Sequence, residues 1–212
     1  MISLFLRHKL FFILTLSSFL LAGCISGGNT ATKFYILDPI DSFKSLITAS
    51  RQKELLSVEV RSFSLPPYLE RPQIVTRTDD NRLRVEEFHH WGGNFRKNIM
   101  RVLAMNLSQF LDTPNIVIAP NGFPAIPDFR IDVTLMQFER GADNTVYFSA
   151  QWQLLCGKVN NVLTSQIINL SREVNKGTRF EHTVSEMSNI IGAFSNIIGK
   201  EIMKQRNGSS NL

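Results

Sequence analysis

The chain has 212 residues, 43% of them hydrophobic, and its 23 Lys and Arg against 18 Asp and Glu give a formal net charge of +5. This length fits one domain with a short extension. A mild positive charge without a dense basic run argues against a nucleic-acid-binding protein, although it is compatible with weak attraction to anionic lipid or to an acidic partner.

The first 23 residues have the layout of a secretory signal peptide. Arg7 and Lys9 precede an apolar run at residues 10–21, which is shorter than the ~20 residues that a membrane-spanning helix needs. The sequence Leu21-Ala22-Gly23-Cys24 resembles the lipobox of bacterial lipoproteins. Cleavage before the cysteine allows lipid chains such as palmitate to anchor the protein through its sulfur. We therefore expect a signal peptide at residues 1–23, lipidation of Cys24 and a flexible tether at residues 24–32, with an uncleaved membrane helix as the alternative.

The residue after Cys24 is Ile25 rather than aspartate. By resemblance to bacterial lipoproteins, this residue directs the protein to the inner leaflet of the outer membrane, where it faces the periplasm. Because Cys24 carries lipid, Cys156 has no partner for an internal disulfide. We expect Cys156 to be a buried structural thiol in a strand.

Residues 33–206 are predicted to form one folded domain, followed by a disordered tail at residues 207–212. Short strands are expected at residues 33–37, 54–65, 73–78, 82–88 and 115–120. Three longer strands with alternating apolar residues should form an antiparallel meander at residues 128–140, 145–156 and 162–174.

Two amphipathic helices complete the predicted domain. The first spans residues 95–110 with Asn94 as its N-cap, and the second spans about residues 183–205. Gly192 and Gly199 weaken the second helix, so packing must hold it. The order predicts a single-domain α/β sandwich, in which two helices cover a mixed, largely antiparallel sheet of seven or eight strands.

Few residues suggest catalysis or metal binding. His89 and His90 are adjacent, so they would point to opposite faces of a strand, and His182 stands apart. No H-E-x-x-H, C-x-x-C or G-x-S-x-G motif occurs. We therefore predict a binding or assembly protein without enzymatic activity, metal or cofactor. A small envelope hydrolase that pairs one of these histidines with a glutamate is the alternative.

The stretch SLPPYLERPQIVTR at residues 64–77 is too apolar for an idle loop and too rich in proline for a helix. Pro66 and Pro67 stiffen the chain and remove backbone donors, while Tyr68, Leu69 and Arg71 are of the types that protein interfaces favour. Two interpretations of Tyr68 and Leu69 are open: they bind a partner as interface anchors, or they pack in the chain's own core. Trp91 has the same two interpretations, with the core preferred.

The order of these motifs resembles the PqiC family, the lipoprotein auxiliary subunits of membrane-integrity transporters, also described as ABC-type transport auxiliary lipoproteins. The family often has an acidic or proline-containing turn after the tryptophan, where this chain has Gly92-Gly93-Asn94-Phe95. The matching residues are Phe34-Tyr35-Ile36-Leu37, Val58, Val60, Leu65-Pro66-Pro67-Tyr68-Leu69, Arg71-Pro72-Gln73-Ile74-Val75, Trp91, Arg101, Leu103 and Asn106-Leu107-Ser108.

The resemblance implies an outer-membrane lipoprotein that works with a periplasm-spanning MCE-domain protein and an inner-membrane partner. Such systems are thought to move phospholipids between the membranes and so to maintain the envelope. It also implies a fold similar to anticodon-binding-like domains and a homo-oligomeric ring on the end of an MCE tunnel, with no nucleic acid involved. The alternative is a structural or pilot lipoprotein for another envelope assembly, such as a secretin or a pilus.

Overall fold

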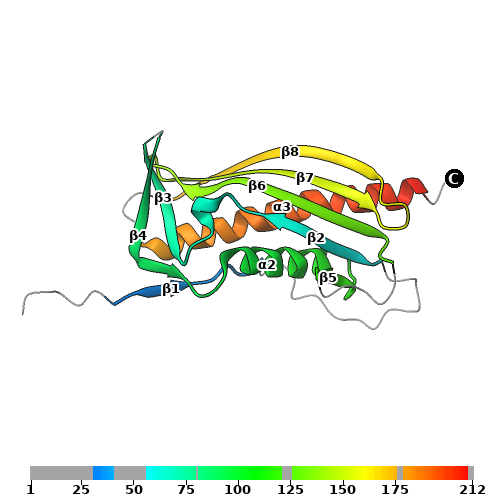
Figure 1. The fold of residues 1–212 in the computed structure, drawn as a ribbon, viewed down its shortest axis with the longest axis horizontal. Coiled ribbons are helices and arrows are strands. Elements are labelled where there is room, and N and C mark those ends of the chain that lie inside the picture. The colour runs from blue at the N-terminus through cyan, green and yellow to red at the C-terminus, as the bar shows by residue number, and fades with distance from the viewer. Residues whose placement is uncertain (1–30, 41–55, 80, 121–125, 176–178, 210–212) are drawn as a thin grey trace, which may run out of the picture. The chain divides into compact units, whose positions relative to one another are not determined.

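The structure, a computed structural model, describes residues 31–40, 56–79, 81–120, 126–175 and 179–209 (Figure 1). The predicted signal peptide, Cys24 and most of the tether lie outside these residues. In the described part of the chain, no helix is long and apolar enough to cross a membrane.

The described strands form one eight-stranded mixed sheet, so the predicted fold class is confirmed. They follow the order β1-β4-β3-β6-β2-β5, and β7 and β8 continue the sheet from β6. The predicted meander is present, because β7 pairs antiparallel with both β6 and β8. The strands are β1 (Lys33–Tyr35), β2 (Val58–Ser64), β3 (Gln73–Asp79), β4 (Arg82–Trp91), β5 (Ile116–Ile118), β6 (Phe129–Arg140), β7 (Thr145–Cys156) and β8 (Val162–Glu173).

One edge of β6 is shared by two strands. Strand β2 runs parallel to its first half, as far as the pair Ser64 and Thr134. Strand β3 reaches the same strand only at its end, where Thr76 pairs with Arg140. Between these points β6 has an irregularity in its pairing with β7, between Leu135 and Gln137. The chain therefore has to bridge a gap in the sheet between β2 and β3, and the proline-rich segment does so.

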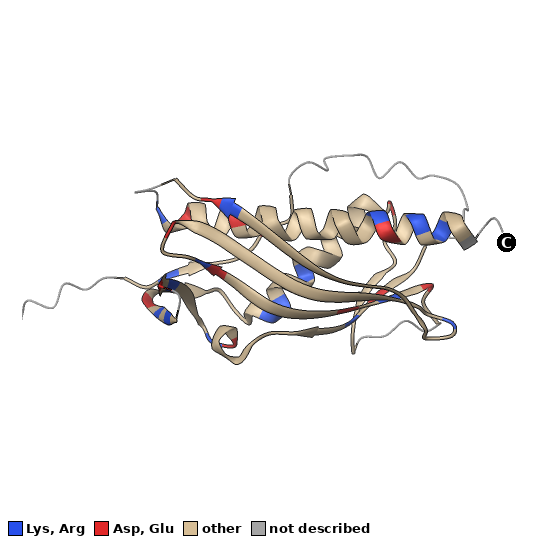
Figure 2. Cartoon of the chain, turned by 90° about the horizontal axis from the view of Figure 1, so that it is seen from above, with Lys and Arg blue, Asp and Glu red and all other residues tan. Residues whose placement is uncertain are grey.

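Helices α2 (Phe95–Phe110) and α3 (Phe180–Ser209) pack on the sheet (Figures 1 and 2). A chain of aromatic rings joins them through the core. The ring centroid of Phe138 on β6 lies 5.9 Å from that of Phe95 on α2 and 5.2 Å from that of Phe148 on β7. The Phe148 centroid lies 5.1 Å from that of Phe194 on α3. The middle of α3, residues 187–199, has no charged residue, and the charges gather toward its ends (Figure 2). This apolar middle is therefore the part of α3 that can lie against the core.

The boundaries of both helices test the sequence predictions. Helix α2 begins and ends as predicted, and the Asn94 side chain accepts a hydrogen bond from the Lys97 N–H at 2.9 Å. Helix α3 begins three residues earlier than predicted, where Phe180 stacks on His89 with ring centroids 4.2 Å apart. It also continues to Ser209, so the disorder predicted from residue 207 is wrong for residues 207–209. Asn207 and Gly208 in this last turn are exposed, and a Cβ on Gly208 would meet nothing within 4 Å.

The two glycines inside α3 allow close packing. A Cβ on Gly192 would lie 1.7 Å from Ile40 Cδ1, and a Cβ on Gly199 would lie 2.3 Å from Phe110 Cδ1. Between them, the Ser195 hydroxyl accepts a hydrogen bond from the Asn106 side chain of α2 at 3.3 Å. The two glycines lower the helix propensity of α3 but allow close contact on this face. This agrees with the prediction that packing stabilises the helix.

Cys156 departs from its prediction. It was expected to be a buried thiol, but it is half-buried at the end of β7. The reason is its position beside a tight turn, where its N–H donates to the Asn161 carbonyl and its carbonyl accepts from the Asn160 N–H.

Candidate functional site

The bridge between β2 and β3, residues 65–72, forms a tight bend that we call the elbow. Its centre is a short 3₁₀ helix, η3 (Pro67–Leu69). The Pro66 carbonyl accepts from the Leu69 N–H at 3.0 Å, and the Pro67 carbonyl accepts from the Glu70 N–H at 3.1 Å. Proline suits the first position of such a turn, because the N–H that it lacks would have no partner there. The two prolines therefore fix the path of the elbow without leaving a backbone donor unsatisfied.

Tyr68 ties the elbow to a buried carboxylate. Its hydroxyl donates to Oε2 of Glu139 at 2.8 Å, and the side chain of Glu139 on β6 is fully buried. Burial raises the pKa of Tyr68, and the negative charge of Glu139 raises it further. The phenol therefore remains a hydrogen-bond donor throughout the ordinary pH range.

Other donors complete the shell around this carboxylate. Arg77 of β3 donates through Nε at 3.0 Å and forms an ion pair through Nη2 at 2.9 Å. The Gln137 side chain donates at 3.0 Å and the backbone N–H of Phe138 at 3.1 Å. A buried charge is tolerated when it is paired and hydrogen-bonded in this way. Glu139 thus joins the elbow, β3 and the irregular part of β6 at the gap in the sheet.

Leu69 and Trp91, both predicted as partner-binding residues, lie in the chain's own core. Their side chains are 4% and 5% exposed. The Trp91 ring stacks on Phe95 with centroids 4.1 Å apart, and the backbone N–H of Trp91 donates to the Pro72 carbonyl at 2.7 Å. In this chain Leu69 and Trp91 are core residues that support the elbow, as the second of the two sequence interpretations states.

The remaining predicted residues are more accessible. Pro67 and Arg71 are exposed, and Pro66 and Tyr68 are half-buried. The structure thus brings five of the six predicted residues together in the elbow and places the sixth, Trp91, beneath it.

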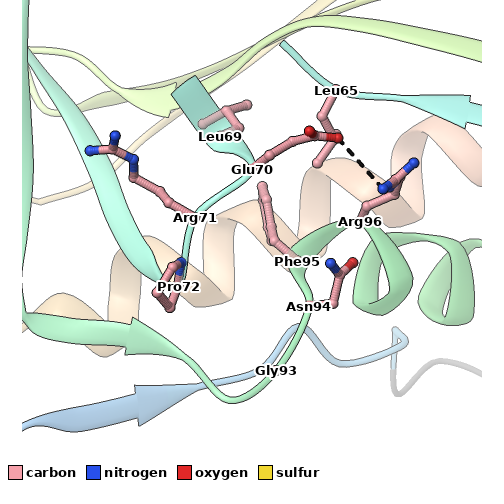
Figure 3. A pocket seen from close by; sticks show the side chains of 9 residues that line it. All are labelled: Leu65, Leu69, Glu70, Arg71, Pro72, Gly93, Asn94, Phe95 and Arg96. Carbon is pink, nitrogen blue, oxygen red and sulfur yellow. Dashed lines mark ion pairs between the residues drawn. The ribbon is translucent and has the colours of Figure 1, made fainter. Parts of the chain in front are cut away.

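A hollow of about 280 Å³ lies between the elbow and the start of α2 (Figure 3). Arg71 and Arg96 lie on opposite sides of it, and Glu70 forms an ion pair with Arg96 at 3.6 Å. Both partners of this pair are 46% exposed, so the pair contributes little to stability. The hollow has room for a small group. Since Glu70 compensates Arg96, Arg71 gives the lining one net positive charge, which favours an acidic group. The sequence prediction missed Glu70 and Arg96, because their nearness depends on how the turn at residues 92–94 places α2.

The histidines are used structurally. The Tyr35 hydroxyl is 2.7 Å from Nδ1 of His89, and burial lowers the pKa of His89. Nε2 of His90 lies 3.0 Å from the backbone carbonyl of Glu87. Within the described ranges, no histidine ring is hydrogen-bonded to a carboxylate, and no group of three or more His, Cys, Asp or Glu side chains could hold a metal ion. Among the described residues, the histidine–glutamate hydrogen bond that the hydrolase alternative would use is not formed.

Comparison with known proteins gives a family match. A family model described as an ABC-type transport auxiliary lipoprotein component matches residues 35–199. Comparison with curated proteins finds no significant match.

Solved structures share the fold at low sequence identity. The crystal structure of an uncharacterized protein is 19% identical, with a TM-score of 0.66, over 81% of this chain and 99% of that chain. Protein XCC0632 from Xanthomonas campestris, of the family DUF330, is 13% identical, with a TM-score of 0.60, over 85% of this chain and 97% of that chain. The PelC dodecamer from Paraburkholderia phytofirmans is 12% identical, with a TM-score of 0.40, over 68% of this chain and 85% of that chain, which is too distant to inform this chain.

Proposed function

Because this chain belongs to the family of ABC-type transport auxiliary lipoprotein components, we propose that it is the outer-membrane lipoprotein of an MCE-type intermembrane lipid transport system. In this role it is an adaptor without catalytic activity that contributes to envelope integrity. The observation that carries the proposal is the family match itself, which spans the elbow, α2 and most of α3.

The elbow is the proposed contact for the MCE-domain partner or for a neighbouring subunit in a homo-oligomeric ring. It is held by the hydrogen bond from Tyr68 to Glu139 and by the buried side chain of Leu69. A segment that is already rigid loses less conformational entropy on binding. Pro67 and Arg71 are exposed on this rigid support, and an exposed arginine beside a hollow is a favourable anchor for an acidic side chain.

The proposed attachment to the membrane is lipidation of Cys24, on the inner leaflet of the outer membrane. Two or more acyl chains make such an anchor stable, since each buried CH₂ contributes about 0.8 kcal/mol. The folded domain then faces the periplasm, where the partner would reach it.

Affinity purification of the full-length, acylated protein, followed by mass spectrometry, tests this proposal. We expect an MCE-domain protein to be recovered with the wild type and to be lost in large part with Arg71→Ala, because truncating an interface anchor costs more than about 1 kcal/mol. Lys158→Ala is the matched control, since Lys158 is also exposed and lies at the turn between β7 and β8. Recovery of a secretin or pilus component instead would contradict the transport role and support the pilot alternative.

A further inference from the structure

Strand β1 and the residue that follows it expose two large apolar side chains at the edge of the sheet. Phe34 is 68% exposed and Ile36 is 54% exposed, while Tyr35 and Leu37 between and after them are buried. A strand with one buried face normally has polar residues on the other face. The segment at residues 34–37 is instead apolar on both faces. Its outer face is largely exposed, although the Phe34 ring lies edge-on to the His90 ring with centroids 5.8 Å apart.

Fixed positive charge lies beside these side chains. A hollow of about 350 Å³ is lined by Ile36 together with Lys97 and Arg101 of α2. Arg101 is held in place because its Nη2 donates to the Leu37 carbonyl at 2.7 Å. Helix α2 contains three basic residues and no acidic residue, so its exposed face is positive.

Asp38 also lines the hollow beside α2, so the two basic residues there leave one net positive charge. The other acidic side chain near Ile36, Glu181, lies on α3. A second hollow, of about 540 Å³, is lined by Phe34, Ile36, Asp38 and Glu181 among others. Glu181 forms an ion pair with Lys33 at 3.5 Å, which compensates part of its charge. The side of Ile36 toward α2 therefore keeps an excess of positive charge.

The sequence places β1 directly after the proposed lipid anchor. Nine residue steps separate Cys24 from Lys33, a distance of at most ~32 Å when fully extended. If Cys24 is lipidated, this covalent link keeps β1 near the lipid headgroups. This constraint favours the bilayer as the surface that Phe34 and Ile36 meet.

We propose that Phe34, Ile36, Lys97 and Arg101 form a membrane patch that rests on the bilayer carrying the anchor. Aromatic and aliphatic side chains enter the boundary between headgroups and acyl chains, and Lys and Arg bind lipid phosphates. The patch rests on the proposed lipidation of Cys24, and it adds a second, non-covalent contact that orients the domain on the membrane.

The test uses the full-length acylated protein in phosphatidylethanolamine–phosphatidylglycerol vesicles with brominated acyl chains, which quench nearby tryptophan. Phe34→Trp reports on the patch, and Ile167→Trp on β8 is the matched control because Ile167 is 64% exposed. The native Trp91 and Trp152 are buried in both variants and give the same background. We expect the Phe34→Trp emission to shift to shorter wavelength and to be quenched at least about twofold more than that of Ile167→Trp, because a patch residue lies within ~10 Å of the headgroup boundary.

Equal quenching of the two variants would overturn the membrane patch. A blue shift at position 34 without quenching by brominated lipid would also overturn it, because a protein neighbour would then cover the site. Failure of the proposed function is distinguished by other measurements. The intact mass shows whether Cys24 is acylated, and co-purification shows whether an MCE-domain protein binds.

Discussion

Replacing Tyr68 with phenylalanine removes the hydroxyl that donates to buried Glu139 at 2.8 Å and leaves the ring in place. A hydrogen bond to a charged group contributes about 1.5–3 kcal/mol, and the carboxylate keeps its other donors. We therefore expect Tyr68→Phe to lower the free energy of unfolding by about 2 kcal/mol, which corresponds to roughly 4–8 °C in Tm for a domain of this size. Urea denaturation of the wild type and the variant, followed by circular dichroism, measures this loss.

Tyr147→Phe is the control for this substitution. The Tyr147 hydroxyl also donates to a carboxylate, that of Asp143, but at an exposed turn. We expect its loss to cost less than about 0.5 kcal/mol, since exposed substitutions usually have small effects. If the two variants lose the same stability, the reasoning that Tyr68 clamps the elbow to a buried charge is refuted. In that case Tyr68 is free to be a partner anchor, as one sequence interpretation allows.

Three further predictions concern stability. Gly199→Ala gains about 1 kcal/mol of helix propensity but forces the new Cβ against Phe110, so we expect the free energy of unfolding to fall by about 1 kcal/mol. Gly208→Ala has open space around it and should lose no stability in the same denaturation assay. Asn94→Ala removes the N-cap bond of α2 and should cost about 1 kcal/mol, and an unchanged denaturation midpoint would contradict the assigned cap. Because burial lowers the pKa of His89, the unfolded state binds more protons below the ordinary histidine pKa of about 6.5, so stability should fall as the pH drops below this value. His89→Phe should flatten that part of the stability profile measured between pH 7.5 and 5.5, and an unchanged slope would contradict the assignment.

Local signals in the sequence predicted most of the fold. Helix α2 carries both its period and its cap in consecutive residues, from Asn94 to Phe110, and its boundaries match the structure. The meander of β6, β7 and β8 follows from alternating apolar residues between two turns. These features depend on neighbours in the chain, which a single sequence shows.

Contacts between distant residues could not be predicted in the same way. Glu139 has the sequence pattern of an ordinary charged residue at a strand end, yet it is fully buried because Tyr68 and Arg77 reach it from another part of the chain. Gly199 indicates a weak helix until Phe110 is seen to occupy the space of its missing side chain. For the same reason the sequence identified the elbow as unusual, but it did not decide whether Leu69 lies in the core or at an interface.

The central claim is that the elbow meets a lipid-transport partner, and crosslinking in cells tests it most directly. A photoreactive amino acid in place of the exposed Glu70 would report what lies against the exposed side of the elbow and would leave Arg71 intact, and the same substitution at Lys158 is the control. We predict a crosslink from position 70, and not from position 158, to an MCE-domain protein or to a second copy of this chain that is itself bound to one. Crosslinks from position 70 to a secretin or pilus component, or identical products from both positions, would contradict this claim.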